Sequence, residues 1–167
     1  MTVRPPTKCP WVLAVLLSAV LAGCAATNSA AVKQPPYRVV NGATYVPVAT
    51  ADREYSREAA TLELPPAHAW PQDPLPKSDS GSPAWYEIGY ARQAADRYWF
   101  CSWAAMAVNA SDVRARREAV EALQGILRLY YYTNALDAHS RPQLAKEVTS
   151  AQKGDLTALR TDVQLNC

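Results

Sequence analysis

Proline is distributed unevenly along this 167-residue chain, and this distribution limits where long helices can form. Of the ten prolines after residue 24, nine lie before Ala84 and only Pro142 lies after it. Proline lacks an amide hydrogen and clashes with the preceding turn, so it breaks a helix interior. The sequence therefore predicts a mostly irregular, proline-rich arm at residues 37–83 and a helical domain at residues 84–167.

Two short segments of the arm favour regular structure. Asn41-Gly42 lies between β-branched and aromatic residues, and this dipeptide favours the tight turn of a β-hairpin. Residues 51–62 are compatible with one short helix capped by Asp52. The segment 65–83 holds six prolines and indicates a wrapping arm, which we expect Trp70 to dock against the helices.

The helical domain is expected to be a small bundle of about four helices, so the fold class is mainly α. Its first helix is predicted from Ala84 to about Val108, with Ser82 as N-cap and Pro83 at the first helical position. The second half of this segment carries no charge on any face. A helix that is apolar all round is typically buried, so we place it at the centre of the bundle.

The second helix is predicted to begin at Ser111 or Asp112. From Val113 to Tyr130 its apolar residues recur at spacings of three, four and seven, which predicts one amphipathic helix over that range.

Capping signals delimit the third and fourth helices. Ser140 and Gln143 have the spacing of a capping box, and Gly154 is expected to end the helix that this box begins. Asp155 is then the predicted cap of the last helix.

Residues 1–23 have the layout of a secretory signal peptide. Arg4 and Lys8 precede an uncharged apolar run of 12 residues from Trp11 to Ala22. A membrane-spanning helix is the competing interpretation, but it takes roughly 20 apolar residues to cross about 30 Å of hydrocarbon. The short run therefore favours a cleaved leader.

The leader ends in Leu21-Ala22-Gly23-Cys24, which resembles the lipobox of bacterial lipoproteins. The resemblance implies that the Cys24 thiol receives a diacylglyceryl group and that the peptide bond before it is cut. Residues 24–36 would then form a flexible, lipid-bearing tether. Ala25 stands where an aspartate would resemble an inner-membrane retention signal, so we expect the outer membrane in a two-membrane cell and otherwise the outer face of the cell membrane.

Two cysteines, Cys101 and Cys167, remain after the leader and the lipidated residue are set aside. An even pair in an exported chain predicts a disulfide. The alternative is one buried thiol and one free thiol near the C-terminus. No metal site is expected, because the sequence has no C-x-x-C motif and neither histidine has a neighbour at ligand spacing.

The sequence shows no catalytic motif and predicts no cofactor, so an enzyme is the least favoured of three hypotheses. Without residues 1–23 the chain has 15 basic and 15 acidic residues, and this balance argues against binding nucleic acid.

The first hypothesis is a non-catalytic interaction module that contacts another envelope protein or a cell-wall component. Three consecutive tyrosines on a helix point about 100° apart, so at least one of Tyr130, Tyr131 and Tyr132 should be exposed. These tyrosines and Trp70 are the predicted contacts. The alternative for these aromatic residues is that they only fill the core of a small domain.

The second hypothesis is a lipoprotein that binds a small ligand or glycan in a cleft between the arm and the first helix. Trp70, Trp85 and Tyr86 are the predicted stacking groups, and Arg92 is the predicted polar anchor.

The C-terminal two-thirds of the chain also resembles small envelope-anchored proteins of actinobacteria. The likeness rests on Trp70-Pro71, on the run from Tyr98 to Trp103, and on Asn166-Cys167. It implies an exported helical domain with a disulfide, and no activity is assigned to that group.

Overall fold

The computed structural model describes residues 37–78 and 82–167. The predicted signal peptide at 1–23, the lipidation site Cys24 and the tether at 24–36 lie outside these residues. The described part is mainly helical, as predicted, and carries a small antiparallel sheet. None of its helices is long and apolar enough to span a bilayer.

The predicted hairpin is present. It consists of β1 (Arg38–Val40) and β2 (Ala43–Pro47), and Asn41 and Gly42 adopt positive φ angles of 51° and 82° in the turn between them. Both positions of this tight turn require positive φ, which is why Asn-Gly favours it.

A third strand, β3 (Trp85–Glu87), pairs with β2 and gives the order β1-β2-β3. We predicted these residues as the start of the long helix, which is wrong. They alternate between half-buried Trp85, buried Tyr86 and exposed Glu87, and this period of two suits a strand once β2 supplies a partner. Gly89, with a φ of 86°, then turns the chain into the helix.

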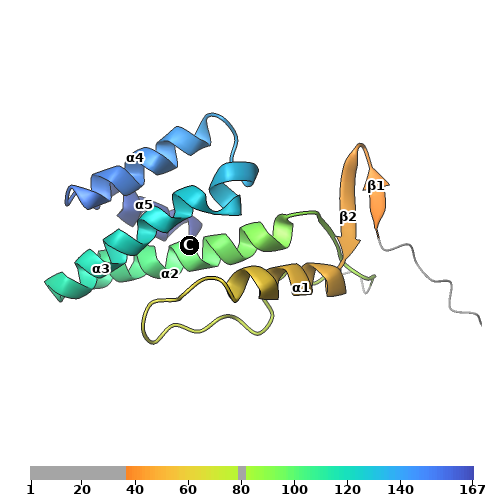
Figure 1. Ribbon diagram of the computed structural model, residues 1–167, viewed down its shortest axis with the longest axis horizontal. Helices are drawn as coiled ribbons and strands as arrows, with labels where there is room; N and C mark the ends of the chain where they lie inside the picture. Colours follow the sequence, from red (N-terminus) through yellow and green to blue (C-terminus); the bar gives the residue numbers. More distant parts are fainter. Residues whose placement is uncertain (1–36, 79–81) are drawn as a thin grey trace, which may run out of the picture. The chain divides into compact units, whose positions relative to one another are not determined.

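The central helix is α2 (Tyr90–Asn109), and the prediction that it is buried is confirmed. Figure 1 shows α2 between α1 (Val48–Ala59) and α3 (Val113–Leu123), and it packs against both. The short helix expected at 51–62 is thus α1, which begins directly after Pro47. Asp52 lies inside α1 and does not cap it.

The Asp112 cap is confirmed, because its Oδ1 accepts a hydrogen bond from the Ala115 amide at 2.8 Å.

The expected continuous helix from Asp112 to Tyr130 is wrong. The chain instead forms α3, the 3₁₀ helix η1 (Gln124–Arg128) and the π-helical turn η2 (Tyr131–Ala135). Val113, the first residue of the predicted stripe, is 73% exposed. The Trp99 ring packs closely against Gly125 of η1 and so helps to hold this irregular segment in place.

Helices α4 (Ser140–Gln152) and α5 (Thr157–Asn166) complete the domain. The expected capping box is not formed. Asp137 caps α4 instead, because its Oδ1 accepts from the amides of His139 and Ser140 at 2.8 and 2.7 Å. Gly154 follows α4 with a φ of 91°, as predicted, and the Asp155 carboxylate accepts from the Thr157 amide at 3.0 Å.

The predicted disulfide joins Cys101 on α2 to Cys167 at the end of α5, with the two Cα atoms 5.5 Å apart. A second contact supports the same junction, because Arg97 Nη2 donates to the Asn166 carbonyl at 2.7 Å. Leu159 of α5 is fully buried. Helix α5 is therefore fastened to α2 by a covalent bond, a hydrogen bond and apolar packing.

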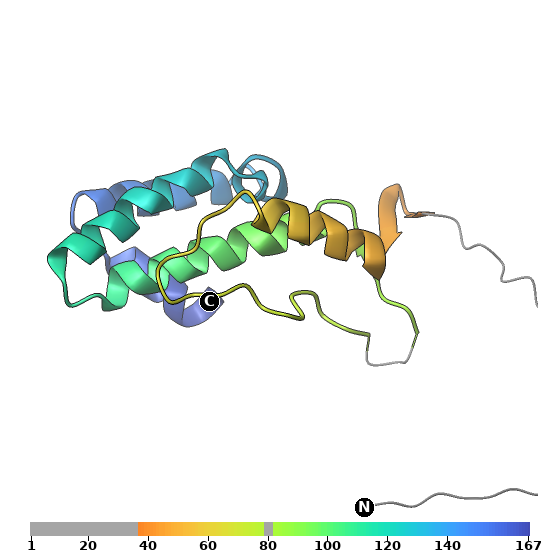
Figure 2. The same cartoon turned by 60° about the horizontal axis from the view of Figure 1, so that its bottom comes forward.

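The part of the predicted arm that follows α1 runs back alongside the helices at residues 60–78, and we keep the name arm for this part (Figure 2). Trp99 and Trp103 both donate their indole N–H to the Glu63 carbonyl, at 2.7 and 2.9 Å. Trp70 docks the arm as predicted, since it packs against both the α2–α5 core and the smaller core under α1. The arm is thus part of the folded domain.

Candidate functional site

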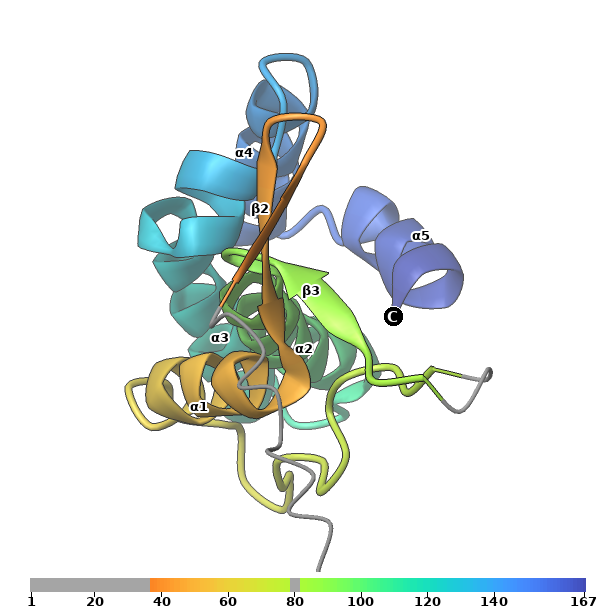
Figure 3. The ribbon, with the colours of Figure 1, turned by 90° about the vertical axis from the view of Figure 1, so that its right-hand side faces the viewer.

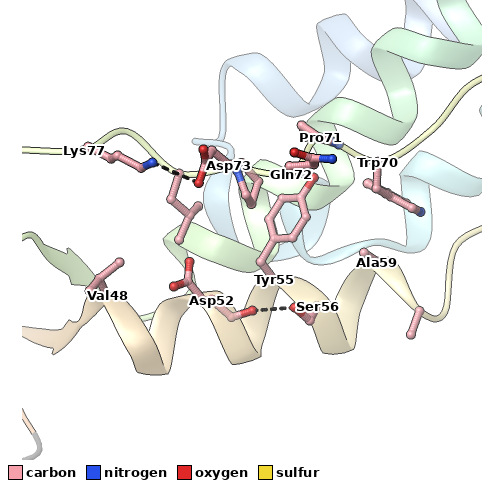
Figure 4. A pocket seen from close by; sticks show the side chains of 13 residues that line it. Val48, Asp52, Tyr55, Ser56, Ala59, Trp70, Pro71, Gln72, Asp73 and Lys77 are labelled. Atoms are coloured by element: carbon pink, nitrogen blue, oxygen red, sulfur yellow. Dashed lines mark hydrogen bonds and ion pairs between the residues drawn. The ribbon is translucent and has the colours of Figure 1, made fainter. Parts of the chain in front are cut away.

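A pocket of about 610 Å³ opens between α1 and the arm (Figure 4). This volume lies within the range of about 300–1,000 Å³ that is common for small-molecule sites. Helix α1 contributes one wall and the arm after Trp70 contributes the other. The lining residues are Val48, Asp52, Tyr55, Ser56, Ala59, Ala60, Trp70, Pro71, Gln72, Asp73, Pro74, Leu75 and Lys77.

Trp70 is held in the pocket wall by two other aromatic rings. Its ring meets Tyr55 edge-on with centroids 5.8 Å apart, and it meets Tyr98 at 5.3 Å with an interplanar angle of 37°. The Tyr98 hydroxyl also donates to the Ala69 carbonyl at 2.7 Å. Because Trp70 is only half-buried, it combines a fixed position with ring surface on the pocket side.

Tyr55 rises from α1 toward Pro71 and Gln72 (Figure 4). The side chain is 4% exposed, and its hydroxyl has no hydrogen-bond partner among the described residues. Burial is the main reason that the pKa of Tyr55 is raised to about 12, and the nearby Tyr98 adds to the effect. The phenol is therefore neutral at physiological pH, beneath the arm.

The charged groups of the pocket are mostly acidic. Asp52 is exposed on α1, and Asp73 forms an ion pair with Lys77 at 3.0 Å. Because this pair neutralises the one lysine, the remaining charge belongs to Asp52. The lining therefore suits a neutral, hydroxyl-bearing ligand or a cationic one better than an anion.

Of the predicted stacking and anchoring residues only Trp70 lines this pocket, whereas Trp85, Tyr86 and Arg92 do not. Trp85 lies on β3 with the Arg38 guanidinium 3.8 Å from its ring centroid. Tyr86 is buried, and its hydroxyl donates to the Pro76 carbonyl. Trp85 and Tyr86 belong to the strand β3 and not to the start of a helix, and Tyr86 fills the core under α1 instead of the pocket.

Arg92 is occupied elsewhere. Its Nε donates to Glu58 Oε2 at 2.7 Å, and its guanidinium lies 4.5 Å from the Tyr130 ring centroid. The hydrogen bond to Glu58 is the main cause of the raised pKa of Arg92. This arginine therefore links α1, α2 and the segment before η2.

The expectation that one of the three tyrosines is exposed is also wrong, because Tyr130, Tyr131 and Tyr132 are each half-buried. Tyr131 and Tyr132 pack against the α2–α5 core, and Tyr131 accepts a hydrogen bond from Arg97 at 3.0 Å. The spacing of 100° per residue assumed an α-helix, whereas this segment is η2.

Sequence reasoning missed Asp96, a completely buried carboxylate on α2. Its Oδ2 accepts from the Tyr131 amide at 2.8 Å, whereas its Oδ1 has no partner among the described residues. Burial raises its pKa from 3.8 to about 6, against the opposing effect of the Tyr131 amide. The sequence signal that could have identified Asp96 was an acidic residue next to an otherwise uncharged helical segment. Because it accepts from the Tyr131 amide, Asp96 acts as a cap for η2.

We expect Asp96 to make stability depend on pH. Between about pH 6 and pH 4 the native carboxyl takes up a proton while the unfolded chain, with a pKa of 3.8, stays ionised. Falling pH therefore favours the native state through this group. Relative to Asp96→Asn, the wild type should gain about 2 kcal/mol as pH falls from 7 to 4, measured by urea unfolding. Parallel pH profiles of the two proteins would contradict this role.

Glu147 has a similarly raised pKa of about 7, caused first by burial and then by Asp162. Glu147 and Asp162 both line a second pocket, of about 290 Å³, together with Arg97 and Asn166. Among the described residues no three potential metal ligands come together, here or elsewhere.

The described fold defines a class: a small helical domain with a three-stranded sheet, one disulfide and a pocket beneath a proline-rich arm. Comparisons of the chain with protein families, with curated proteins and with solved structures give no match. The functional argument therefore rests on the residues themselves.

Proposed function

We propose that this chain is a lipid-anchored lipoprotein of the bacterial envelope that works by binding and carries out no reaction. The lipobox-like segment ending at Cys24 supports the anchor. The Cys101–Cys167 disulfide supports an oxidising compartment, where such bonds persist. Several acyl chains hold a domain at a membrane almost permanently, whereas one gives only reversible binding.

Of the two binding hypotheses, the α1–arm pocket favours a small ligand or glycan over a protein partner. The observation that carries this choice is a 610 Å³ pocket with Trp70 fixed in its wall and polar groups beside it. A flat aromatic ring flanked by hydrogen-bonding groups suits the apolar face and hydroxyls of a sugar. A protein partner through Tyr130–Tyr132 has less support, because these side chains are half-buried.

The anchor is tested by metabolic labelling with a fatty acid. Wild-type protein should carry the label and fractionate with membranes, whereas Cys24→Ala should lose the label completely. Cys9→Ala is the matched control, because Cys9 lies in the predicted leader and should leave labelling unchanged. Label that persists in Cys24→Ala would refute the assignment.

The pocket is tested by titrating the protein with a β-1,4-linked disaccharide of N-acetylglucosamine while tryptophan emission is recorded. We expect a saturable change, and Asp52→Asn should weaken it about tenfold, as for the loss of one hydrogen bond to a charged group. Glu121→Gln, an exposed acid on α3, is the control and should bind like wild type. If no sugar of this class saturates the signal, the glycan assignment fails, whatever the labelling result.

A further inference from the structure

The exposed apolar side chains of the described residues are concentrated around the small sheet. Eight large apolar side chains are exposed in this part of the chain. Six lie on the sheet or directly beside it, and the other two, Val113 and Leu165, lie on α3 and α5. The six are Tyr37, Val39, Val40, Val48, Ile88 and Tyr90.

The pairing of the strands explains why part of one sheet face is uncovered. Val39 pairs with Thr44, and the Ile88 amide donates to the Thr44 carbonyl at 2.9 Å, so these three residues form one row across the sheet. The next row on the same face contains Val46 and Tyr86, which are buried against the helices. The helices therefore cover this face at Val46 and Tyr86 but not at Val39 and Ile88.

The uncovered side chains form a small apolar surface on this face of the hairpin. Val39 and Ile88 are 61% and 52% exposed, and Tyr37, two positions before Val39 and therefore on the same face, is 54% exposed. We call these three residues the hairpin patch. Val40 is 51% exposed on the opposite face. The hairpin stands at one end of the helices (Figures 1 and 3), so a flat surface can meet the patch. Apolar residues gathered in this way mark an interaction surface.

We propose that the hairpin patch rests on the lipid bilayer at the level of its headgroups. This inference depends on the proposed acyl anchor, because it uses the position of Cys24. Tyr37 lies only 13 positions after Cys24, and a chain of this length spans at most about 45 Å. The anchor therefore keeps the patch within reach of the membrane at all times, which makes the bilayer its most abundant neighbour.

The composition of the hairpin also suits a membrane interface. Tyr37 combines an apolar body with a polar tip, and such side chains are enriched where hydrocarbon meets water. Arg38, Trp85 and Glu87 lie on the opposite face of the sheet, where the Arg38 guanidinium covers the Trp85 ring. Because Val39 and Ile88 share their row with the uncharged Thr44, the contact should depend on apolar insertion and should not require anionic lipids.

The test is sedimentation with vesicles of zwitterionic phosphatidylcholine. It uses residues 24–167 with Cys24→Ser, exported behind a cleavable leader so that the disulfide forms. Without an acyl group, binding reports the patch alone, so failed acylation in the labelling experiment would leave this result interpretable. We expect the protein to sediment with vesicles and Val39→Asp or Ile88→Asp to lower the partition coefficient about tenfold each.

Two matched controls separate the patch from general hydrophobicity. Val113→Asp and Leu165→Asp remove apolar side chains of α3 and α5 that are more exposed, at 73% and 76%, and both variants should sediment like the parent protein. Unchanged circular dichroism would show that each variant folds. The proposal is overturned if the parent protein does not partition, or if all four variants lose binding equally. A dimer or protein complex that Val39→Asp dissociates, without vesicle binding, also overturns it.

Discussion

Removal of the Cys101–Cys167 disulfide should lower the thermal unfolding midpoint by about 10–15 °C. The bond joins residues 66 positions apart, so it restricts a large part of the unfolded chain. The loop-entropy relation gives about 4 kcal/mol for a loop of this size. For a domain of this length, each kcal/mol corresponds to about 3–4 °C in the midpoint.

The reduced protein should nevertheless fold at room temperature. Leu159 stays buried without the disulfide, and Arg97 can still donate to the Asn166 carbonyl. Calorimetry of wild type with and without reductant measures the shift, and Cys101→Ser/Cys167→Ser should match the reduced wild type. Reductant should not change the midpoint of the double variant. A midpoint that moves by less than about 2 °C would show that the bond contributes little.

Gly89→Ala should destabilise the domain by about 3 kcal/mol, because two costs combine at this position. Gly89 has a φ of 86°, a conformation that alanine adopts only with strain. A Cβ atom there would also overlap the ring and hydroxyl of Tyr130. Tyr130 would have to move out from beneath the Arg92 guanidinium, which disturbs the Arg92–Glu58 ion pair as well.

Gly154→Ala separates these two costs. Gly154 has nearly the same φ, 91°, but a Cβ there would meet no atom within 4 Å. Its substitution should cost only about 1 kcal/mol, and the remainder for Gly89→Ala is the contact with Tyr130. Denaturant unfolding of both variants measures the difference. Equal losses would mean that Tyr130 moves aside without penalty.

The two proposed surfaces lie close together. Val48 follows β2 directly, is exposed beside the sheet, and also lines the α1–arm pocket. If the hairpin patch rests on the bilayer, the pocket is held near the membrane surface. The ligand would then be encountered there, which can be examined by repeating the sugar titration on lipidated protein in vesicles.

Only a few elements of the candidate site could be predicted from the sequence. Trp70 was expected to dock the arm, because it is a large apolar side chain in a proline-rich segment, and it does. Its partners Tyr55 and Tyr98 lie 15 residues before it and 28 after it, and nothing local indicates that they meet. Trp85 and Tyr86 lie on β3 instead of a helix, and Arg92 is paired with Glu58 of α1, so none of the three lines the pocket.

Local signals were sufficient wherever short-range chemistry decides the conformation. Asn41-Gly42 specifies the hairpin turn, Asp112 caps α3 and Gly154 follows α4. The Cys101–Cys167 disulfide followed from counting cysteines and not from local conformation, since its residues lie 66 positions apart. The absence of charge from the second half of α2 correctly predicted that this segment is buried, because a helix without a polar face is unfavourable at a solvent-exposed surface.

Tertiary contacts decided the rest. Residues 85–87 form a strand because β2 offers its edge, although Ser82-Pro83 is an adequate helix start. The chain leaves the α-helix after Leu123, where Trp99 packs closely against Gly125 and the buried Asp96 caps η2 from another helix. The arm wall of the pocket is held by contacts from other elements, because Tyr98 donates to the Ala69 carbonyl and Tyr86 to the Pro76 carbonyl. Each of these features depends on residues distant in the chain, whose free energy of contact outweighs local conformational preference.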